Sequence, residues 1–275
     1  MDSDLQGIEQ RQCASWDDFK MRIHADLYQQ DPGYELGRFE LGRYIFRGHG
    51  SAKWKLIPTF DRWFKGPRRD ALKIEEELFN HFKRECKGQE DLPKDVFDDK
   101  YMMMGIAQHH GLPTRLLDWT DSPYIAAFFA FSELLPHKGE TRLQAEDQFA
   151  AVWVLDTKRS LWRPAVGGVE IVEVPPSSNY RLRNQTAKFT YPTTAMFPGL
   201  EEVVSNYATG GAVTSDRSLT HLFKYLIPTR EARVALSDLQ LMGIDFRRIF
   251  PDREGYALGA KMNIVLRHPQ FEYGS

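Results

Sequence analysis

Residues 108–124 have the sequence QHHGLPTRLLDWTDSPY and run directly into an apolar segment, IAAFFAF, at residues 125–131. The middle of this stretch is predicted to bend, because Gly111 permits a positive φ and Pro113 fixes its own φ while disfavouring a helical Leu112. The stretch therefore predicts a polar bend that leads into a buried segment.

The buried segment is predicted to be a helix with a defined start. Ser122 or Asp121 can cap it, with Pro123 at the first helical position, where the missing N–H costs nothing. Upstream, Arg115 and Asp118 flank two leucines that must point inward. We expect these two charges either to form a structural ion pair or to contact a ligand.

Hydrophobic periodicity and breaker residues place the other elements. Strands and helices are interspersed without strict alternation, which favours the α+β class. The Glu75–Glu77 run is expected to be a solvated helix face. The boundaries place a polar tail at 1–14 and a single domain at 15–275, with its core at 41–135 and 149–266 and a long loop at 192–216. Helices are predicted from Ser15 and over 70–87, 101–108, 229–242 and 253–262, and strands over 41–46, 149–156, 169–174 and 222–228.

Length and composition set the class of protein. A chain of 275 residues with 42% hydrophobic content can bury a large core. The formal net charge of -2 argues against a broadly basic nucleic-acid surface. Cys13 and Cys86 lie too far apart in sequence for a metal or redox motif, and no apolar run approaches the length of a membrane span. A cytoplasmic protein with no membrane partner is predicted.

Two segments resemble a known family. The chain is identified as a member of the FRG domain family by YIFRGH at residues 44–49 and by QHHGLPTRLLDWT at residues 108–120. The resemblance extends through WKLIP at 54–58 and to IFPD at 249–252. It implies a layout similar to ADP-ribosyltransferase folds, a mixed and mostly antiparallel split sheet with surrounding helices. An Arg47–Gly48 first motif and a second motif at 122–130 are expected from it.

This resemblance implies NAD as cofactor and transfer of ADP-ribose. Breaking the N-glycosidic bond requires a pyrophosphate holder, a carboxamide partner and an aromatic ring for nicotinamide. Arg47 suits the pyrophosphate, because its planar fork pairs with phosphate oxygens, and Gly48 leaves its backbone open. Tyr124, Phe128 and Tyr44 are the candidates for stacking on nicotinamide. The expected catalytic residues are Arg47, His49 and Gln185, and the expected cofactor-binding residues are Arg47, Gly48, Gln108, His109, Thr114, Arg115, Asp118, Thr120, Ser122, Tyr124 and Phe128.

The third motif departs from the transferase pattern. Such enzymes supply a glutamate from a late strand, whereas the best-placed stretch here, residues 184–189, offers Gln185. A glutamine can bind a ribose hydroxyl but cannot stabilise a cation by charge. This favours single transfer, or no catalysis, over polymer synthesis. The remaining candidate carboxylates are Glu231, Glu173, Glu202 and Asp118.

Three functions follow from these observations. The first is an NAD-dependent mono-ADP-ribosyltransferase or related NAD glycosidase, acting on a macromolecular acceptor that is either a protein or a nucleic acid. The second is a non-catalytic binding module for a nucleotide, nucleic acid or peptide, with Arg181, Arg183 and Lys188 along a groove. The third is a metal-assisted hydrolase using His49, His109 and His110, although we expect no metal site. The sequence leaves the oligomeric state open.

Overall fold

The computed structural model describes residues 8–28, 42–87, 94–136, 147–174, 187–209 and 222–268. The chain folds into two compact units, and each unit is built from segments that are separate in the sequence. The first unit comprises residues 1–8, 55–119 and 158–221, and the second comprises residues 9–54, 120–157 and 222–275. We describe each unit by itself, and a single domain over 15–275 stays a prediction.

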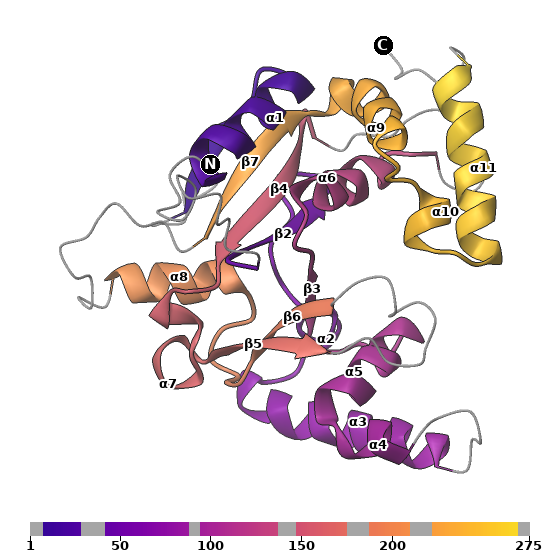
Figure 1. Cartoon of the computed structure of the whole chain (residues 1–275). Coiled ribbons are helices and arrows are strands. Elements are labelled where there is room, and N and C mark those ends of the chain that lie inside the picture. Colours follow the sequence, from indigo (N-terminus) through magenta and orange to yellow (C-terminus); the bar gives the residue numbers. More distant parts are fainter. Residues whose placement is uncertain are drawn as a thin grey trace. The chain divides into compact units, whose positions relative to one another are not determined.

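The second unit is built on a four-stranded sheet of order β1-β7-β4-β2, of which β7, β4 and β2 are labelled in Figure 1. The β1–β7 pair is parallel, while β7–β4 and β4–β2 are antiparallel. The predicted strands at 149–156 and 222–228 are confirmed, and the strand predicted to end at Phe46 continues through His49. The strands are β1 (Glu9–Gln12), β2 (Tyr44–His49), β4 (Phe149–Asp156) and β7 (Leu222–Pro228).

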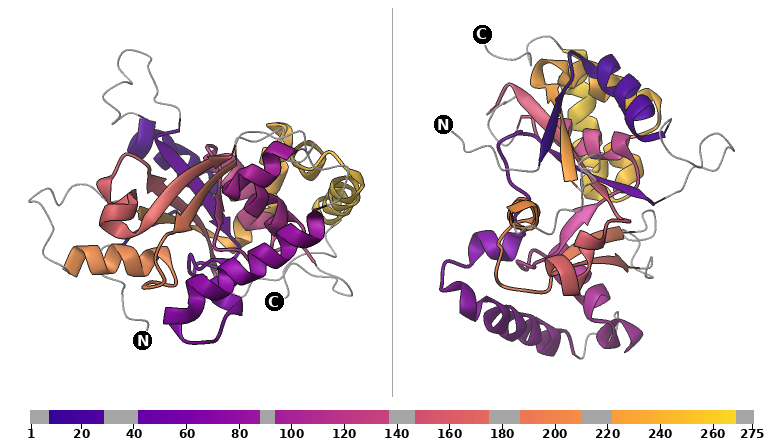
Figure 2. Two further views of the ribbon diagram at one scale, coloured as in Figure 1. Left: turned by 90° about the horizontal axis from the view of Figure 1, so that it is seen from below. Right: turned by 90° about the vertical axis from the view of Figure 1, so that its left-hand side faces the viewer.

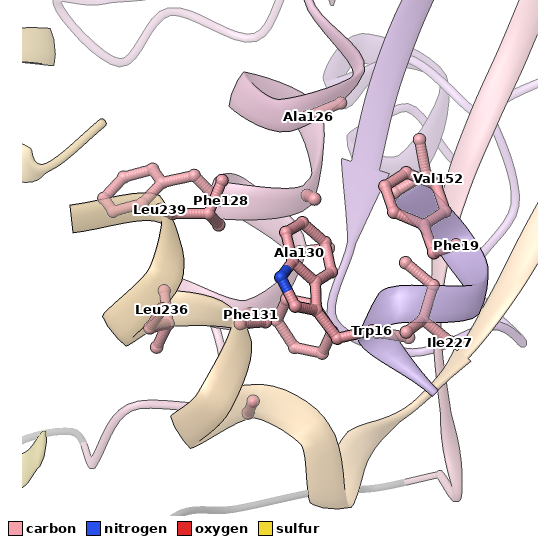
Figure 3. Close-up of a cluster of buried hydrophobic side chains, with 14 of the residues drawn as sticks. Trp16, Phe19, Ala126, Phe128, Ala130, Phe131, Val152, Ile227, Leu236 and Leu239 are labelled. Atoms are coloured by element: carbon pink, nitrogen blue, oxygen red, sulfur yellow. The ribbon is translucent and has the colours of Figure 1, made fainter. Parts of the chain in front are cut away.

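Helices cover one face of this sheet and enclose the largest apolar core (Figure 3). Trp16 lies within it, stacked on Phe19 at 5.3 Å between ring centroids and edge-on to Phe131 at 6.1 Å. Ser15 caps the first helix and Ser122 caps the helix after the bend, as their sequence positions predict. The helices are α1 (Trp16–Ile23), η1 (His24–Tyr28), α6 (Pro123–Ser132), η5 (Thr229–Glu231), α9 (Ala232–Leu241), α10 (Phe246–Ile249) and α11 (Arg253–Arg267).

Gly48 sets the distance between β2 and α6. A Cβ atom at this position would lie 1.9 Å from the carbonyl oxygen of Ala126 and 2.7 Å from the backbone nitrogen of Ala130. Only a residue without a side chain lets the helix backbone come this close. Gly48 is therefore closed toward α6, and the expected contact of its backbone with a carboxamide stays a prediction.

The first unit contains a three-stranded antiparallel sheet of order β3-β6-β5, visible from further directions in Figure 2. Apolar residues of β5 and β6 pack against Met104 of α5 in one cluster, while a second cluster of Val96, Met103 and Ile106 joins α4 and α5. Gly111 has a φ of 85°, as the predicted bend requires. The elements are α2 (Thr59–Trp63), η3 (Arg68–Asp70), α3 (Ala71–Cys86), α4 (Lys94–Asp98), α5 (Lys100–His109), β3 (Leu117–Trp119), η4 (Ser160–Trp162), α7 (Pro164–Gly167), β5 (Val169–Val174), β6 (Ala187–Pro192) and α8 (Leu200–Thr209).

Two segments differ from the predicted pattern. Residues 9–12, expected in a polar tail, form β1 at the edge of the sheet, where polar side chains are tolerated because one edge needs no apolar cover. Residues 200–209, expected within a long loop, form α8. Its buried residues Leu200, Val203 and Val204 have helical spacing, and both carboxylate oxygens of Glu201 accept the Leu56 N–H.

Thr229, which is predicted to cap the helix over 229–242, has a different role in the structure. The Thr229 hydroxyl donates to the carbonyl oxygens of Asp147 and Gln148, and α9 begins after a short 3₁₀ turn. Residues 54–58 form an irregular connection that leads into α2.

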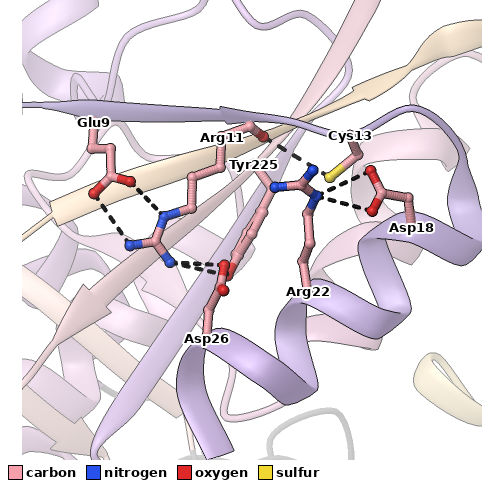
Figure 4. A network of polar contacts seen from close by, with 7 residues as sticks. All are labelled: Glu9, Arg11, Cys13, Asp18, Arg22, Asp26 and Tyr225. Carbon is pink, nitrogen blue, oxygen red and sulfur yellow. Dashed lines mark hydrogen bonds and ion pairs between the residues drawn. The ribbon is translucent and has the colours of Figure 1, made fainter. Parts of the chain in front are cut away.

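A polar network ties β1 to α1 and η1 (Figure 4). Arg11 lies 2.8 Å from Glu9 and 2.9 Å from Asp26, and its guanidinium carbon lies 4.2 Å above the Phe223 ring. The Tyr225 hydroxyl donates to Asp26 at 2.9 Å. Burial raises the pKa of the neighbouring Cys13 thiol to about 12. The network anchors a strand whose own side chains bury little.

Replacing Gly48 with alanine is expected to lower the free energy of unfolding by about 3 kcal/mol or more, because three backbone atoms of α6 occupy the space of the new methyl group. Gly105→Ala is the matched control. Its Cβ would meet only the tip of Phe189 at 3.9 Å inside a helix, so the change is expected to be neutral or stabilising by up to about 1 kcal/mol. Urea denaturation measures both, and equal effects would refute the account of Gly48.

Candidate functional site

Arg47 and His49 project from the face of β2 opposite α6. They alternate along the strand with Phe46, which is buried in the core, and with Gly48. The Arg47 Nε–H donates to His49 Nε2 at 3.2 Å, and His49 Nδ1 lies 3.3 Å from the carbonyl oxygen of Trp54. Both contacts are satisfied when His49 carries its hydrogen on Nδ1. His49 therefore orients the guanidinium of Arg47.

Arg47 belongs to a row of side chains across three strands. Its register partner on β4 is Trp153, whose partner on β7 is Lys224, so the three side chains share one face of the sheet. The Lys224 Nζ lies 4.8 Å from the centroid of the Trp153 ring and donates to the carbonyl oxygen of Ala52 at 2.7 Å. The row therefore places two cations beside one indole.

The indole N–H of Trp153 has no hydrogen-bond partner among the described residues, although the side chain is only 2% exposed. A buried N–H without a partner costs about 1–3 kcal/mol. Such a group calls for an explanation, because nearly all buried donors in folded proteins are paired. An acceptor oxygen of a bound molecule would supply the missing partner.

The residues expected on α6 serve its structure. The Ser122 hydroxyl accepts the Ile125 N–H and caps the helix, and the Thr120 hydroxyl accepts the Ser122 N–H. Phe128 is fully buried, with its ring centroid 4.9 Å from that of Phe246. Phe128 is therefore a core residue, which corrects its expected stacking on nicotinamide.

The two tyrosines proposed for stacking are partly buried. Tyr124 meets Trp16 edge-on at 6.2 Å between centroids, and burial raises the pKa of its hydroxyl. The guanidinium carbon of Arg43 lies 4.9 Å above the Tyr44 ring. Both rings pack against the core of the second unit.

Arg115 is completely buried in the first unit and fixes its polypeptide connections. Its Nε lies 3.0 Å from Asp61 Oδ2, and its two terminal nitrogens donate to the carbonyl oxygens of Pro192 and Thr194 at 3.1 and 2.8 Å. An ion pair was expected, but its partner is Asp61 rather than the exposed Asp118. The role of Arg115 is structural, which corrects its expected contact with a cofactor.

Gln108 holds the two sides of the bend together. Its Nε2 donates to Asp118 Oδ1, while its Oε1 accepts the Thr114 hydroxyl, each at 2.5 Å. Thr114 is buried and also accepts the Leu116 N–H. Of this group, Asp118 is exposed on the surface.

The predicted site residues are divided between the two units. His109 is exposed beside His110, with 5.3 Å between their ring centroids, and Gln185 lies outside the described residues, as do Arg181 and Arg183. Convergence of all predicted residues on one ligand stays a prediction. Arg47, Gly48, His49, Thr120, Ser122, Tyr124 and Phe128 belong to the second unit, whereas Gln108, His109, Thr114, Arg115 and Asp118 belong to the first.

Among the candidate carboxylates, three have structural partners. Glu231 accepts the backbone N–H of Trp16 at 3.1 Å, Glu173 lies 3.3 Å from Lys188 Nζ, and Asp118 is bound by Gln108. The described residues contain no group of three His, Cys, Asp or Glu side chains arranged to hold a metal ion.

Glu75 departs from the expected solvated run. It is 5% exposed, whereas its neighbours Glu76 and Glu77 face water. The Tyr191 hydroxyl donates to its Oε2 at 3.1 Å, while its Oε1 has no hydrogen-bond partner among the described residues. Burial raises the pKa of Glu75 to about 7 against the opposing charge of Arg115. The carboxyl is therefore poised to titrate near neutrality.

Several of these partners are absent from the sequence-based expectations. Trp153 and Lys224 lie in strands that were predicted, but their register with Arg47 depends on pairing between distant segments. The sequence around Asp61 could have indicated a structural role, since Asp61 is a single carboxylate between Phe60 and a cationic segment. Nothing in the sequence around Glu133 indicates that its Oε2 accepts the Gly50 N–H at 2.6 Å.

Comparison with known proteins identifies part of the chain. Residues 42–139 match the family model of the FRG domain and are therefore an FRG domain. The match contains both motifs that the sequence comparison rests on and ends well before residues 249–252. No curated protein and no solved structure matches the chain significantly. Within the described ranges, no helix is both long and apolar enough to cross a membrane.

Asp61→Asn is expected to destabilise the protein by about 3–5 kcal/mol, because it leaves the buried guanidinium of Arg115 without its counter-charge. Asp118→Asn makes the same chemical change at an exposed site and is expected to cost less than about 1 kcal/mol. Chemical denaturation compares the two variants. Similar losses in both would show that the Arg115–Asp61 pair has no special role.

The free energy of unfolding is expected to fall as the pH rises, because of the buried carboxyl of Glu75. Its carboxyl has a higher pKa in the folded protein than in the unfolded chain, so the stability that its proton contributes is complete below pH 4.5 and is lost as the pH rises through about 7. The loss is bounded at roughly 3 kcal/mol. Glu75→Gln keeps an acceptor for Tyr191 and is expected to flatten this dependence and to raise stability at pH 8. Parallel pH profiles for the two proteins would contradict it.

Proposed function

We propose that the protein is an NAD-dependent mono-ADP-ribosyltransferase or a related NAD glycosidase of the cytoplasm, which binds the NAD pyrophosphate with Arg47. The proposal is carried by the unpartnered indole N–H of Trp153 in register with Arg47. The resemblance of the FRG motifs to the transferase layout supports it, because that resemblance implies a first motif at Arg47–Gly48.

The row of Arg47, Trp153 and Lys224 suits a dinucleotide by its charge and donors. A pyrophosphate offers several acceptor oxygens and two negative charges, and a guanidinium fork pairs with two such oxygens at once. The indole N–H can donate to a further oxygen of the same group. Lys224 adds positive charge on the same face of the sheet. These groups bind an anion better than a neutral ligand.

His49 positions Arg47. By accepting from Nε, it fixes one edge of the guanidinium and leaves the planar group in a defined orientation. The backbone carbonyl of Trp54 in turn fixes the ring of His49. A cation held in this way loses less conformational entropy when it binds a ligand.

In the proposed transfer, the bond between the ribose C1′ and the nicotinamide nitrogen breaks, and nicotinamide leaves with the electron pair. A nucleophile of the macromolecular acceptor, or water in the glycosidase reaction, forms the new bond to C1′ and gives up its proton. Arg47 holds the pyrophosphate against the protein while the positive charge develops on the ribose. Gln185 remains the candidate for binding a ribose hydroxyl.

A second candidate is a binding module without catalysis, for a nucleotide, nucleic acid or peptide. One observation favours it: three of the four candidate carboxylates, Glu231, Glu173 and Asp118, are held by structural partners. A site that binds NAD without a carboxylate for the ribose cation would retain the ligand unchanged. The two candidates share Arg47 and differ in turnover.

Nicotinamide release from NAD tests the proposal together with calorimetric NAD binding. Arg47→Ala is expected to weaken binding about 100-fold, since it removes the charge-assisted contacts to phosphate. Trp153→Phe removes the N–H but keeps an apolar ring and is expected to cost about 10-fold. Arg84→Ala, an exposed cation of the first unit, is the control and should leave both quantities unchanged.

The outcomes separate the candidates. Release that disappears in Arg47→Ala supports the transferase or glycosidase. Binding without release, lost in the same variant, selects the binding module. Absence of both release and binding removes NAD from the account, as would equal effects of Arg47→Ala and Arg84→Ala.

A further inference from the structure

A short segment of the first unit is strongly cationic and carries an exposed tryptophan. Residues 62–69 have the sequence RWFKGPRR, with four cations and no carboxylate, in a chain whose net charge is -2. Trp63 is 55% exposed, and Arg62, Lys65 and Arg69 face water. The segment therefore offers an exposed aromatic face together with cations that can contact phosphate.

The residues just before this segment anchor it firmly. Phe60 is fully buried, and its N–H donates to the carbonyl oxygen of Thr114 at 2.9 Å. Phe64 stacks on Phe60 with 5.6 Å between centroids and 12° between ring planes. The Trp63 ring leans on Phe60 at 5.9 Å. The exposed indole is thus presented from a packed aromatic base.

A second anchor holds the far end of the segment. Arg68 Nη1 lies 2.6 Å from Asp61 Oδ1, and Arg68 Nε donates to the carbonyl oxygen of Ala195 at 3.0 Å. Because Asp61 is buried and also pairs with Arg115, its negative charge is already compensated inside the unit. Arg62, Lys65 and Arg69 therefore present positive charge outward from a fixed turn.

We propose that residues 62–69 bind single-stranded nucleic acid, with Trp63 stacking on an unpaired base and Arg62, Lys65 and Arg69 contacting phosphates. Cations that follow a phosphate backbone, interleaved with an aromatic ring for the bases, are the two elements that sequence-tolerant binding of single strands requires. This surface lies in the unit that does not contain Arg47, and the inference does not depend on NAD chemistry.

Two other polyanions fit less well. α2 has only five residues and buries Phe60, so it offers no apolar helix face for insertion into a membrane surface. A duplex keeps its bases stacked, so Trp63 would have no base face to contact. An unpaired strand uses both the charge and the ring.

Fluorescence anisotropy with a labelled oligothymidylate of about 15 nucleotides tests the inference. Binding is expected to weaken steeply between about 50 and 200 mM salt, because each phosphate contact releases counterions. Trp63→Ala should weaken it roughly 5- to 150-fold, and Trp63→Phe should recover part of the loss. The double variant Arg62→Glu/Lys65→Glu should abolish it at the higher salt. Arg84→Glu, an exposed charge reversal on α3, is the control and should bind as the wild type does.

Three results would overturn the inference: no binding at the lower salt, equal binding by the Trp63→Ala and wild-type proteins, or preferential binding to phosphatidylserine vesicles that is lost in the same variants. Thermal melting of each variant shows whether it is folded. Oligonucleotide binding in a protein that neither binds nor cleaves NAD would leave this surface in place while removing the proposed enzyme activity.

Discussion

The close approach of helix α6 to strand β2 at Gly48 determines which side chains of β2 face the core of the second unit and which face away from it. With Ala126 and Ala130 pressed against the position of a missing side chain, Phe46 enters the core on the same face of the strand. The alternation of the strand then sends Arg47 and His49 to the other face. The Phe-Arg-Gly triplet thus combines a core anchor, a contact that only glycine permits and an outward cation. Its middle residue is placed by the packing of the two that flank it.

The same logic separates structural charges from available ones. Arg115 and Arg47 look alike in sequence, since each lies next to apolar residues in an FRG motif. Arg115 is fully buried and binds Asp61 and two backbone carbonyls, so its charge is used to join segments of the first unit. Arg47 is only partly buried, and its Nε–H donates to His49 Nε2, so the contact orients the guanidinium at the surface of the strand. The two arginines therefore differ in burial.

Local signals predicted much of the fold. Continuous apolar runs gave β4 and β7, hydroxyl caps gave the starts of α1 and α6, and Gly111 marked the bend. What the sequence could not supply depends on pairing between distant segments. The polar strand β1 is defined by its parallel partner β7, and Glu75 is buried because a neighbouring sheet, rather than its own helix, covers it.

The candidate site shows the same division. Arg47 and His49 are predicted from a motif and from flanking glycines, they contact each other on β2, and their shared role in a ligand site stays a prediction. Trp153 and Lys224 were missed, because only the register of β2, β4 and β7 brings them beside Arg47. Phe128 is expected to stack on nicotinamide, whereas its ring belongs to the core. An aromatic residue within an apolar helix is more safely assigned to packing.

The most direct test of this account observes the indole N–H of Trp153 itself. Nuclear magnetic resonance of protein labelled with nitrogen-15 resolves indole signals from the six tryptophans, and the signal absent in Trp153→Phe identifies this one. The account predicts that NAD moves the Trp153 signal downfield, as a new hydrogen bond to an oxygen requires, and that Arg47→Ala prevents the shift. A Trp153 signal that stays in place at NAD concentrations saturating the protein would contradict it.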